Sequence, residues 1–183
     1  IQTVRYMRDE GKFLGGDDLE RPPQMFVGAA CNPFADPFEI RARRLAKKVA
    51  AGVEFIQTQC IYNLDKFELW MKQIRDMGIH EKVYILAGVT PFKSAGMAKY
   101  MKSRVPGMDV PDEVVKRMSG VTKDQQPEEG IKICVESIQR LKEVEGIKGF
   151  HIMAIEWEEK VPEIVERSGL FPRPLVSSNP FTL

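Results

Sequence analysis

The feature that most constrains the fold of this chain is a helical stretch followed by a short apolar run, repeated along its length. Apolar runs begin near residues 26, 55 and 83, and a fourth occupies 149–155. Such runs suit buried parallel strands, and their alternation with helices is typical of parallel α/β architecture. Helices are expected at 1–11, 37–51, 64–78, 92–103, 111–119, 128–144 and 158–168.

Four strands are half of the number that a (β/α)8 barrel requires. The pattern therefore predicts either half of a barrel, over residues 1–171, or a small open sheet, with 172–183 as a Pro-rich surface tail. No run is followed by the GxGxxG fingerprint of a dinucleotide-binding sheet. Because the chain starts at Ile1 and a half-barrel has two unpaired edges, we interpret it as truncated and expect a missing half, a partner subunit or an oligomer.

The charge and the cysteines of the chain argue against several classes of protein, namely those that bind nucleic acid, a membrane or zinc. Lys and Arg total 27 against 26 Asp and Glu, which gives no electrostatic footprint for nucleic acid or an anionic membrane. No apolar run reaches the roughly 18 residues that span a bilayer. Three widely spaced cysteines lack zinc-ligand spacing and indicate reduced, buried thiols. We therefore expect a cytoplasmic protein with no metal site.

Ligand sites of parallel α/β proteins lie at the carboxyl ends of the strands. Gln57 and Gln59 end the second strand and alternate with Phe55, so all three face the same side. Two amides on an apolar strand need buried partners or a polar ligand, and their place at the strand end favours a ligand. Arg41, Arg44 and Lys48 form a helical stripe that could hold a pyrophosphate or be a solvated helix face.

The two histidines carry weaker signals. His80 lies in a charged turn and is expected to be solvated. His151 lies inside an apolar strand, which favours a hydrogen-bonded core histidine over a catalytic base. Nothing in the sequence resembles a nucleophile–base pair, so no catalytic residue is assigned.

Four segments, CNPFADPFE, KKVAAGVEFIQTQ, ILAGVTP and GFHIMAIEW, resemble in order and spacing the C-terminal half of methylenetetrahydrofolate reductases. The most specific piece is LAKKVAAGVEFIQTQ, residues 45–59. The resemblance implies the C-terminal half of a (β/α)8 barrel that binds FAD. NAD(P)H would reduce the flavin, which would reduce 5,10-methylenetetrahydrofolate, a folate-type pterin, to the 5-methyl form.

The resemblance also implies roles for individual residues. Gln59 matches a glutamine that hydrogen-bonds the pterin, and Lys48 matches a basic residue on the flavin side. Arg41 and Arg44 stand where relatives often carry Asp and Asn. Asn32 begins a flavin-contacting loop, in which Asp36 stands where many relatives have His. The predicted flavin-binding residues are therefore Asn32, Asp36, Arg41, Arg44, Lys48 and Gln57.

The predicted substrate-binding residues are Gln59, Met97, Met101 and Trp157. Met97 and Met101 stand where many members have a glutamine and an aromatic residue, and Trp157 replaces an arginine that helps bind the folate tail. This pattern is similar to a branch of the family in anaerobic one-carbon pathways. The resemblance therefore leaves open a related methylene-pterin as substrate.

The family's general acid, a glutamate on the first strand, and an aspartate near the flavin have no counterpart here. Glu156 is a weak substitute, since acid catalysis requires contact with the pterin nitrogen. An alternative function is a non-catalytic subunit that binds pterin or flavin and completes a site on a partner. A lyase or aldolase would need a strand-end lysine, and Lys93 lies in a helix-start loop.

Overall fold

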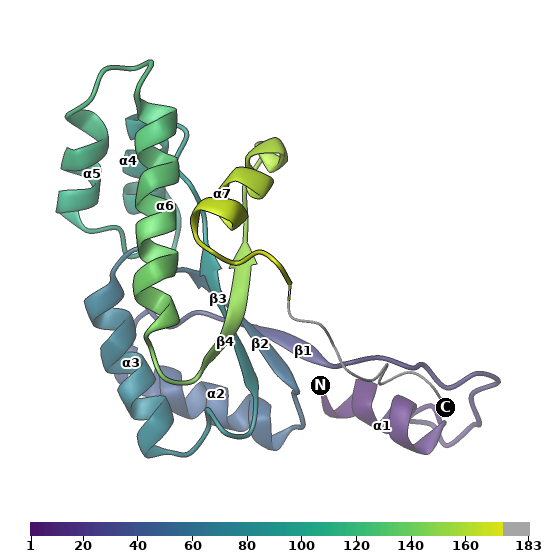
Figure 1. The fold of residues 1–183 in the computed structure, drawn as a ribbon. Helices are drawn as coiled ribbons and strands as arrows, with labels where there is room; N and C mark the ends of the chain where they lie inside the picture. The colour runs from purple at the N-terminus through teal and green to yellow at the C-terminus, as the bar shows by residue number, and fades with distance from the viewer. Residues whose placement is uncertain (174–183) are drawn as a thin grey trace.

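A computed structural model describes residues 1–173 and contains a four-stranded parallel sheet (Figure 1). The strands are β1 (Gly28–Cys31), β2 (Phe55–Cys60), β3 (Tyr84–Val89) and β4 (Ile147–Ile152), and they lie in the order β1-β2-β3-β4. Each strand pairs in parallel with its neighbour in the sequence. The four strands with their flanking helices are consistent with a partial (β/α)8 barrel, so the predicted fold class is confirmed.

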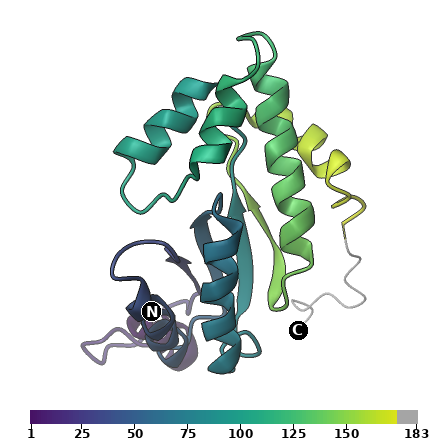
Figure 2. The same ribbon diagram turned by 90° about the vertical axis from the view of Figure 1, so that its left-hand side faces the viewer.

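Helices cover one face of this sheet. They are α2 (Arg41–Ala50), preceded by a 3-10 turn at Phe38–Ile40, α3 (Leu64–Asp76), α6 (Gln126–Lys142) and α7 (Val161–Arg167), preceded by a 3-10 turn at Glu158–Lys160. Figure 2 looks onto this side and shows α3 and α6 in front of the strands. Leu45, Trp70 and Ile138 bring the buried faces of three of these helices into one core with Ile56 and Ile85 of the sheet.

A second, smaller core lies beyond the carboxyl ends of the strands. It is formed by α4 (Ala95–Arg104) and α5 (Asp112–Ser119), which pack against the upper part of α6 (Figure 1). Tyr62 and Phe92 stack there with ring centroids 4.5 Å apart. This layer lies at the carboxyl ends of the strands, where parallel α/β proteins carry their ligand sites.

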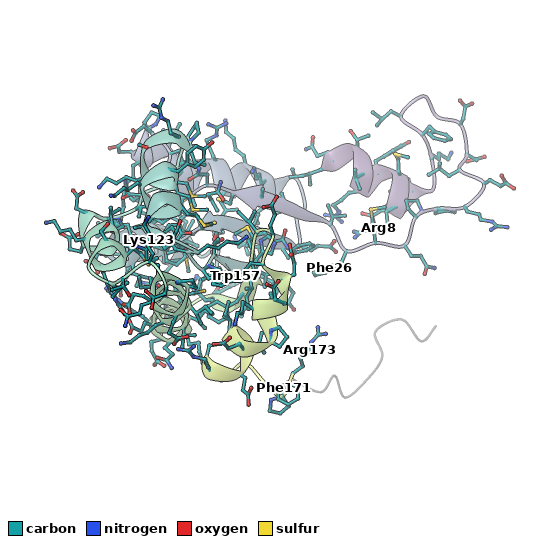
Figure 3. All side chains as sticks on the ribbon, turned by 90° about the horizontal axis from the view of Figure 1, so that it is seen from above. Arg8, Phe26, Lys123, Trp157, Phe171 and Arg173 are labelled. Carbon is teal, nitrogen blue, oxygen red and sulfur yellow. The ribbon has the colours of Figure 1, made fainter. Side chains whose placement is uncertain are left out.

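An N-terminal arm, residues 1–23, precedes the sheet. Its helix α1 (Gln2–Glu10) has no buried residue and extends away from the body (Figure 1). Arg8 joins the arm to the body through an ion pair with Glu54 at 2.7 Å, and the same carboxylate accepts the Val27 N–H. Figure 3 shows Arg8 within the arm and Phe26 where the arm meets the body.

No helix of the described residues 1–173 covers the second face of the sheet, and this face is aromatic near the amino ends of the strands. Phe26 and Phe55 stack with centroids 5.6 Å apart, and Tyr84 lies 6.1 Å from Phe26. Gly28 is required beneath this cluster, because a Cβ there would lie 2.1 Å from the Phe55 ring. Phe26 and Tyr84 are more than half exposed. In a closed barrel this face would be the interior.

The expected elements are found, with shifted boundaries. The fourth strand was expected at 149–155 but pairs with β3 from Ile147 and ends at Ile152. Ile155 and Glu156 lie in a turn instead, and Glu156 has a positive φ of 50°. The predicted division at residue 171 stays a prediction, and all of the tail beyond residue 173 lies outside the described residues.

Candidate functional site

A pocket of about 430 Å³ lies where α2 meets the carboxyl ends of β1, β2 and β4. That volume is within the usual range for small-molecule sites. The pocket brings together six of the ten predicted site residues, namely Asn32, Arg41, Arg44, Lys48, Gln57 and Gln59. Its other lining residues are Ala30, Cys31, Leu45, Thr58, His151 and Met153.

A β-bulge in β2 shapes the floor of this pocket. The register between β2 and β3 shifts between Gln57 and Cys60. The Thr58 hydroxyl accepts the Gly88 N–H at 2.8 Å, in place of a regular backbone partner. Bulges commonly reorient side chains beside functional sites. Here the bulge allows three consecutive residues, Gln57, Thr58 and Gln59, to line the pocket.

The bulge also fixes the orientation of the Gln59 amide. Its Oε1 accepts the Cys60 backbone N–H at 3.1 Å. The carbonyl oxygen is thus engaged, whereas the side-chain NH₂ group has no partner among residues 1–173 and can donate two hydrogen bonds. Gln59 is therefore set to bind an acceptor on a ligand.

Three cations on α2 form one wall of the pocket. Arg41, Arg44 and Lys48 share a helix face because they are three and four residues apart. Lys48 donates to the Ala30 carbonyl, and one Arg41 amino group donates to the Asp36 carbonyl. The Arg41 Nε is buried and has no hydrogen-bond partner within residues 1–173. A buried donor without a partner is costly, so this wall is suited to an anion.

Cys31 lines the pocket beside these cations but is not a nucleophile. Burial raises the pKa of its thiol to about 11, and the nearby charges of Lys48 and Arg41 only partly oppose this shift. Because the thiolate is the reactive form, the neutral thiol is inert at physiological pH.

Asn32 lines the pocket and also holds the loop that follows β1 through hydrogen bonds. Its Oδ1 accepts the Phe34 and Ala35 N–H groups at 2.9 and 3.1 Å, and its Nδ2 donates to the Gly107 carbonyl at 3.1 Å. Gly107 has a φ of 77°, and a Cβ there would collide with the Asn32 amide. These contacts hold the loop after β1 against the segment between α4 and α5.

Four predicted site residues do not line this pocket. Asp36 contacts Arg41 through its backbone carbonyl. Met101 is buried in the second core, where its sulfur accepts the Tyr62 hydroxyl at 3.3 Å, and Met97 packs against the same core. Trp157 packs against the main core. Their contacts with flavin or substrate stay predictions.

Glu156 and Lys93 meet away from the pocket. The Lys93 ammonium donates to the Glu156 carbonyl at 2.7 Å and so joins the loops that follow β3 and β4. Neither side chain lines the pocket. The contact therefore has a structural role in this part of the fold.

His151 is a pocket residue that the sequence interpretation did not identify. It was expected to be a hydrogen-bonded core histidine, but it is half-buried and lines the pocket. Its Nδ1 has no hydrogen-bond partner within the described chain. A signal that could have found it is the alternation of side chains along the strand. His151 is two residues from both Gly149 and Met153 and so shares the uncovered face with them.

Within residues 1–173, no group of three His, Cys, Asp or Glu side chains is arranged to hold a metal ion. In the same residues, no helix is both long and apolar enough to cross a membrane.

The parallel strands, with a cation-lined pocket at their carboxyl ends, define a segment of a (β/α)8 barrel. Residues 23–169 match the family described as methylenetetrahydrofolate reductase. The chain belongs to the methylenetetrahydrofolate reductase family.

Relatives of known name agree with this assignment. Methylenetetrahydrofolate reductase 1 of Schizosaccharomyces pombe is 28% identical, over 98% of this chain and 32% of the relative. A probable methylenetetrahydrofolate reductase (NADPH) of Caenorhabditis elegans is 22% identical, over 93% of this chain and 25% of the relative. The chain thus spans a third or less of these relatives.

A solved structure supports the fold. An uncharacterised protein from Clostridium thermocellum that binds two copies of 5-methyl-5,6,7,8-tetrahydrofolic acid superposes with a TM-score of 0.54. The two sequences are 14% identical, and the match covers 79% of this chain and 52% of that protein.

Proposed function

We propose that this chain supplies flavin and pterin contacts for the FAD-dependent reduction of 5,10-methylenetetrahydrofolate, or a related methylene-pterin, to the 5-methyl form. NAD(P)H is the proposed electron donor. The observation that carries the proposal is the single pocket that joins the α2 cations to the strand-end amides Gln57 and Gln59. Family membership and the folate named for the fold relative support a pterin as the substrate.

The α2 wall fits the anionic part of FAD. Arg41 offers a buried Nε without a partner, and Arg44 and Lys48 add positive charge to the same wall. A pyrophosphate would satisfy the Arg41 donor with a charge-assisted hydrogen bond. These residues would hold the cofactor, and Gln57 would contact it from the adjacent strand.

When bound, the flavin supplies hydride transfer, which no protein side chain can perform. The residues of this chain bind and orient the reactants. In this proposal Gln59 donates from its side-chain NH₂ group to an acceptor on the pterin, because its oxygen already accepts the Cys60 N–H. The half-buried position of Gln59 at the strand end would hold the ring over the pocket floor.

We also propose that the uncovered face is closed by the rest of a barrel, in the same chain or in a partner subunit. The exposed rings of Phe26 and Tyr84 favour this arrangement, because large apolar side chains on an open sheet face are usually buried in an assembly. The family's acid and the aspartate near the flavin would then come from that half.

The test compares flavin absorbance and NAD(P)H oxidation of the protein at its natural full length with those of residues 1–183. The proposal predicts a yellow full-length protein that oxidises NAD(P)H when a methylene-pterin is added. A full-length protein that binds no flavin and oxidises no NAD(P)H contradicts it.

One observation favours a second candidate, a non-catalytic subunit that binds pterin or flavin. None of the described residues that line the pocket is a carboxylate, so the pocket as described offers no acid of the kind that the family uses. This candidate predicts that the full-length protein binds flavin or 5-methyltetrahydrofolate without oxidising NAD(P)H. The same experiment therefore distinguishes the two functions.

A further inference from the structure

His151 and Gln59 lie on either side of one glycine. Gly88 of β3 is the register partner of His151 on β4, and the Gln59 carbonyl lies 2.9 Å from the position that a Gly88 Cβ would occupy. The Thr58 carbonyl would lie still closer, at 2.4 Å. The bulge in β2 therefore requires glycine at this position, and the nearest side-chain atom to the same point is the Met153 methyl carbon, at 3.0 Å.

Within residues 1–173, the imidazole of His151 makes no hydrogen bond. Its Nδ1 is buried without a partner in the described residues, while the side chain lines the pocket. Buried polar groups in folded proteins are nearly always hydrogen-bonded, and exceptions often mark functional positions. A histidine without a fixed partner can present either a donor or an acceptor to a ligand.

The surroundings of the imidazole suit a flat heterocycle. Met153, two residues further along, lines the same pocket and offers an apolar, polarisable surface to a ring. A pterin carries hydrogen-bond donors and acceptors along the edge of an otherwise flat ring. Such a ring, packed on Met153 over Gly88, would meet a polar side chain on each side.

We propose that His151 is a second ligand-contacting residue of this pocket, which hydrogen-bonds the polar edge of the pterin ring opposite Gln59. The inference rests on the proposed function and deepens it. It assigns His151 a direct contact with the ligand, in addition to the one assigned to Gln59.

The test measures the dissociation constant of 5-methyltetrahydrofolate for the full-length protein and four variants. His151→Phe keeps the ring shape but removes both nitrogens, and it is expected to weaken binding about tenfold, the effect of losing one hydrogen bond. His151→Gln keeps a polar group of similar reach and is expected to stay within about threefold of the wild type. His80→Gln is the matched control and should bind normally, because His80 lies outside the pocket, next to Glu81 and Glu145.

A spectroscopic readout covers the case in which His151→Phe does not fold. The ¹⁵N resonances of the His151 ring in the wild-type protein should shift when 5-methyltetrahydrofolate is added, and those of His80 should not. Normal binding by His151→Phe, equal losses in His151→Phe and His151→Gln, or an unchanged His151 resonance would overturn the inference.

Gln59→Leu separates this inference from the proposed function. If Gln59→Leu weakens binding and His151→Phe does not, the pterin site stands and the role of His151 is wrong. If the wild-type protein binds no 5-methyltetrahydrofolate, both are wrong.

Discussion

At the scale of single residues, the cations of α2 differ in what they contact. Lys48 lines the pocket and donates to the Ala30 carbonyl, whereas the adjacent Lys47 lies outside the pocket lining. Successive helical residues point about 100° apart, so the two lysines face different surroundings. This pair allows the role of one charge to be measured against a neighbour of the same chemistry.

We expect Lys48→Met to weaken FAD binding about tenfold, because it removes one charge-assisted contact with an anion. Lys47→Met should bind FAD like the wild type. The measurement is flavin retention or fluorescence titration of the full-length protein. Equal affinities of the two variants would show that the stripe is a solvated helix face.

The predictability of the site also differs from residue to residue. Gln57, Gln59 and the cationic stripe could be predicted, because strand parity and helical spacing are local properties of the sequence. The bulge that brings Thr58 into the pocket depends on pairing with β3, so no local pattern shows it. The place of His151 likewise depends on the side of the sheet that the helices cover.

At the scale of the elements, close packing sets which glycines are required. Gly130 lies in the first turns of α6, where a Cβ would be 1.7 Å from the Phe92 carbonyl oxygen. Gly96 lies in the first turn of α4, where the nearest atom to a Cβ is the Ser94 Oγ at 3.5 Å. A methyl group therefore has no room at Gly130 and has room at Gly96.

We expect Gly130→Ala to lower the free energy of unfolding by about 3 kcal/mol, since α6 or the Phe92 backbone must move. Gly96→Ala should raise it by about 0.5 kcal/mol, because alanine restricts the unfolded chain and favours the helix. Urea unfolding of the full-length protein followed by circular dichroism checks both. A mild effect of Gly130→Ala would mean that α6 lies further from the β3–α4 loop.

The order and type of the elements could be predicted from the sequence, but some of their ends could not. The last apolar run continues to Ile155, so the sequence contains no stop signal at Ile152. The strand ends there because the chain turns toward α7. The first strand was expected from near residue 26 but begins at Gly28, because the Val27 N–H is bound by the Glu54 side chain and not by a backbone carbonyl of β2.

At the scale of the whole molecule, the sheet has two unlike faces. Its helix-covered face packs against the main core. Its uncovered face is aromatic near the amino ends of the strands and polar near their carboxyl ends. Tyr84 on the uncovered face and Tyr100 on α4 are similarly exposed, at 56% and 61%. If the rest of a barrel closes the uncovered face, as proposed, it would cover Tyr84.

We expect Tyr84→Asp to destabilise the full-length protein by more than about 2 kcal/mol, since the carboxylate would be buried without a partner. Tyr100→Asp should change stability by less than about 0.5 kcal/mol, as is usual for surface substitutions. Thermal unfolding of both variants gives the comparison. Two equally stable variants would mean that the aromatic face remains open to solvent.

The strand order has a consequence for biosynthesis. Because β1-β2-β3-β4 is also the order of the sequence, β2, β3 and β4 each pair with the strand that left the ribosome just before them. Contacts between nearby segments form faster than those that wait for distant partners. We expect the sheet to grow strand by strand during translation, which hydrogen exchange on ribosome-bound chains of increasing length would detect as protection of β2 before β4 is synthesised.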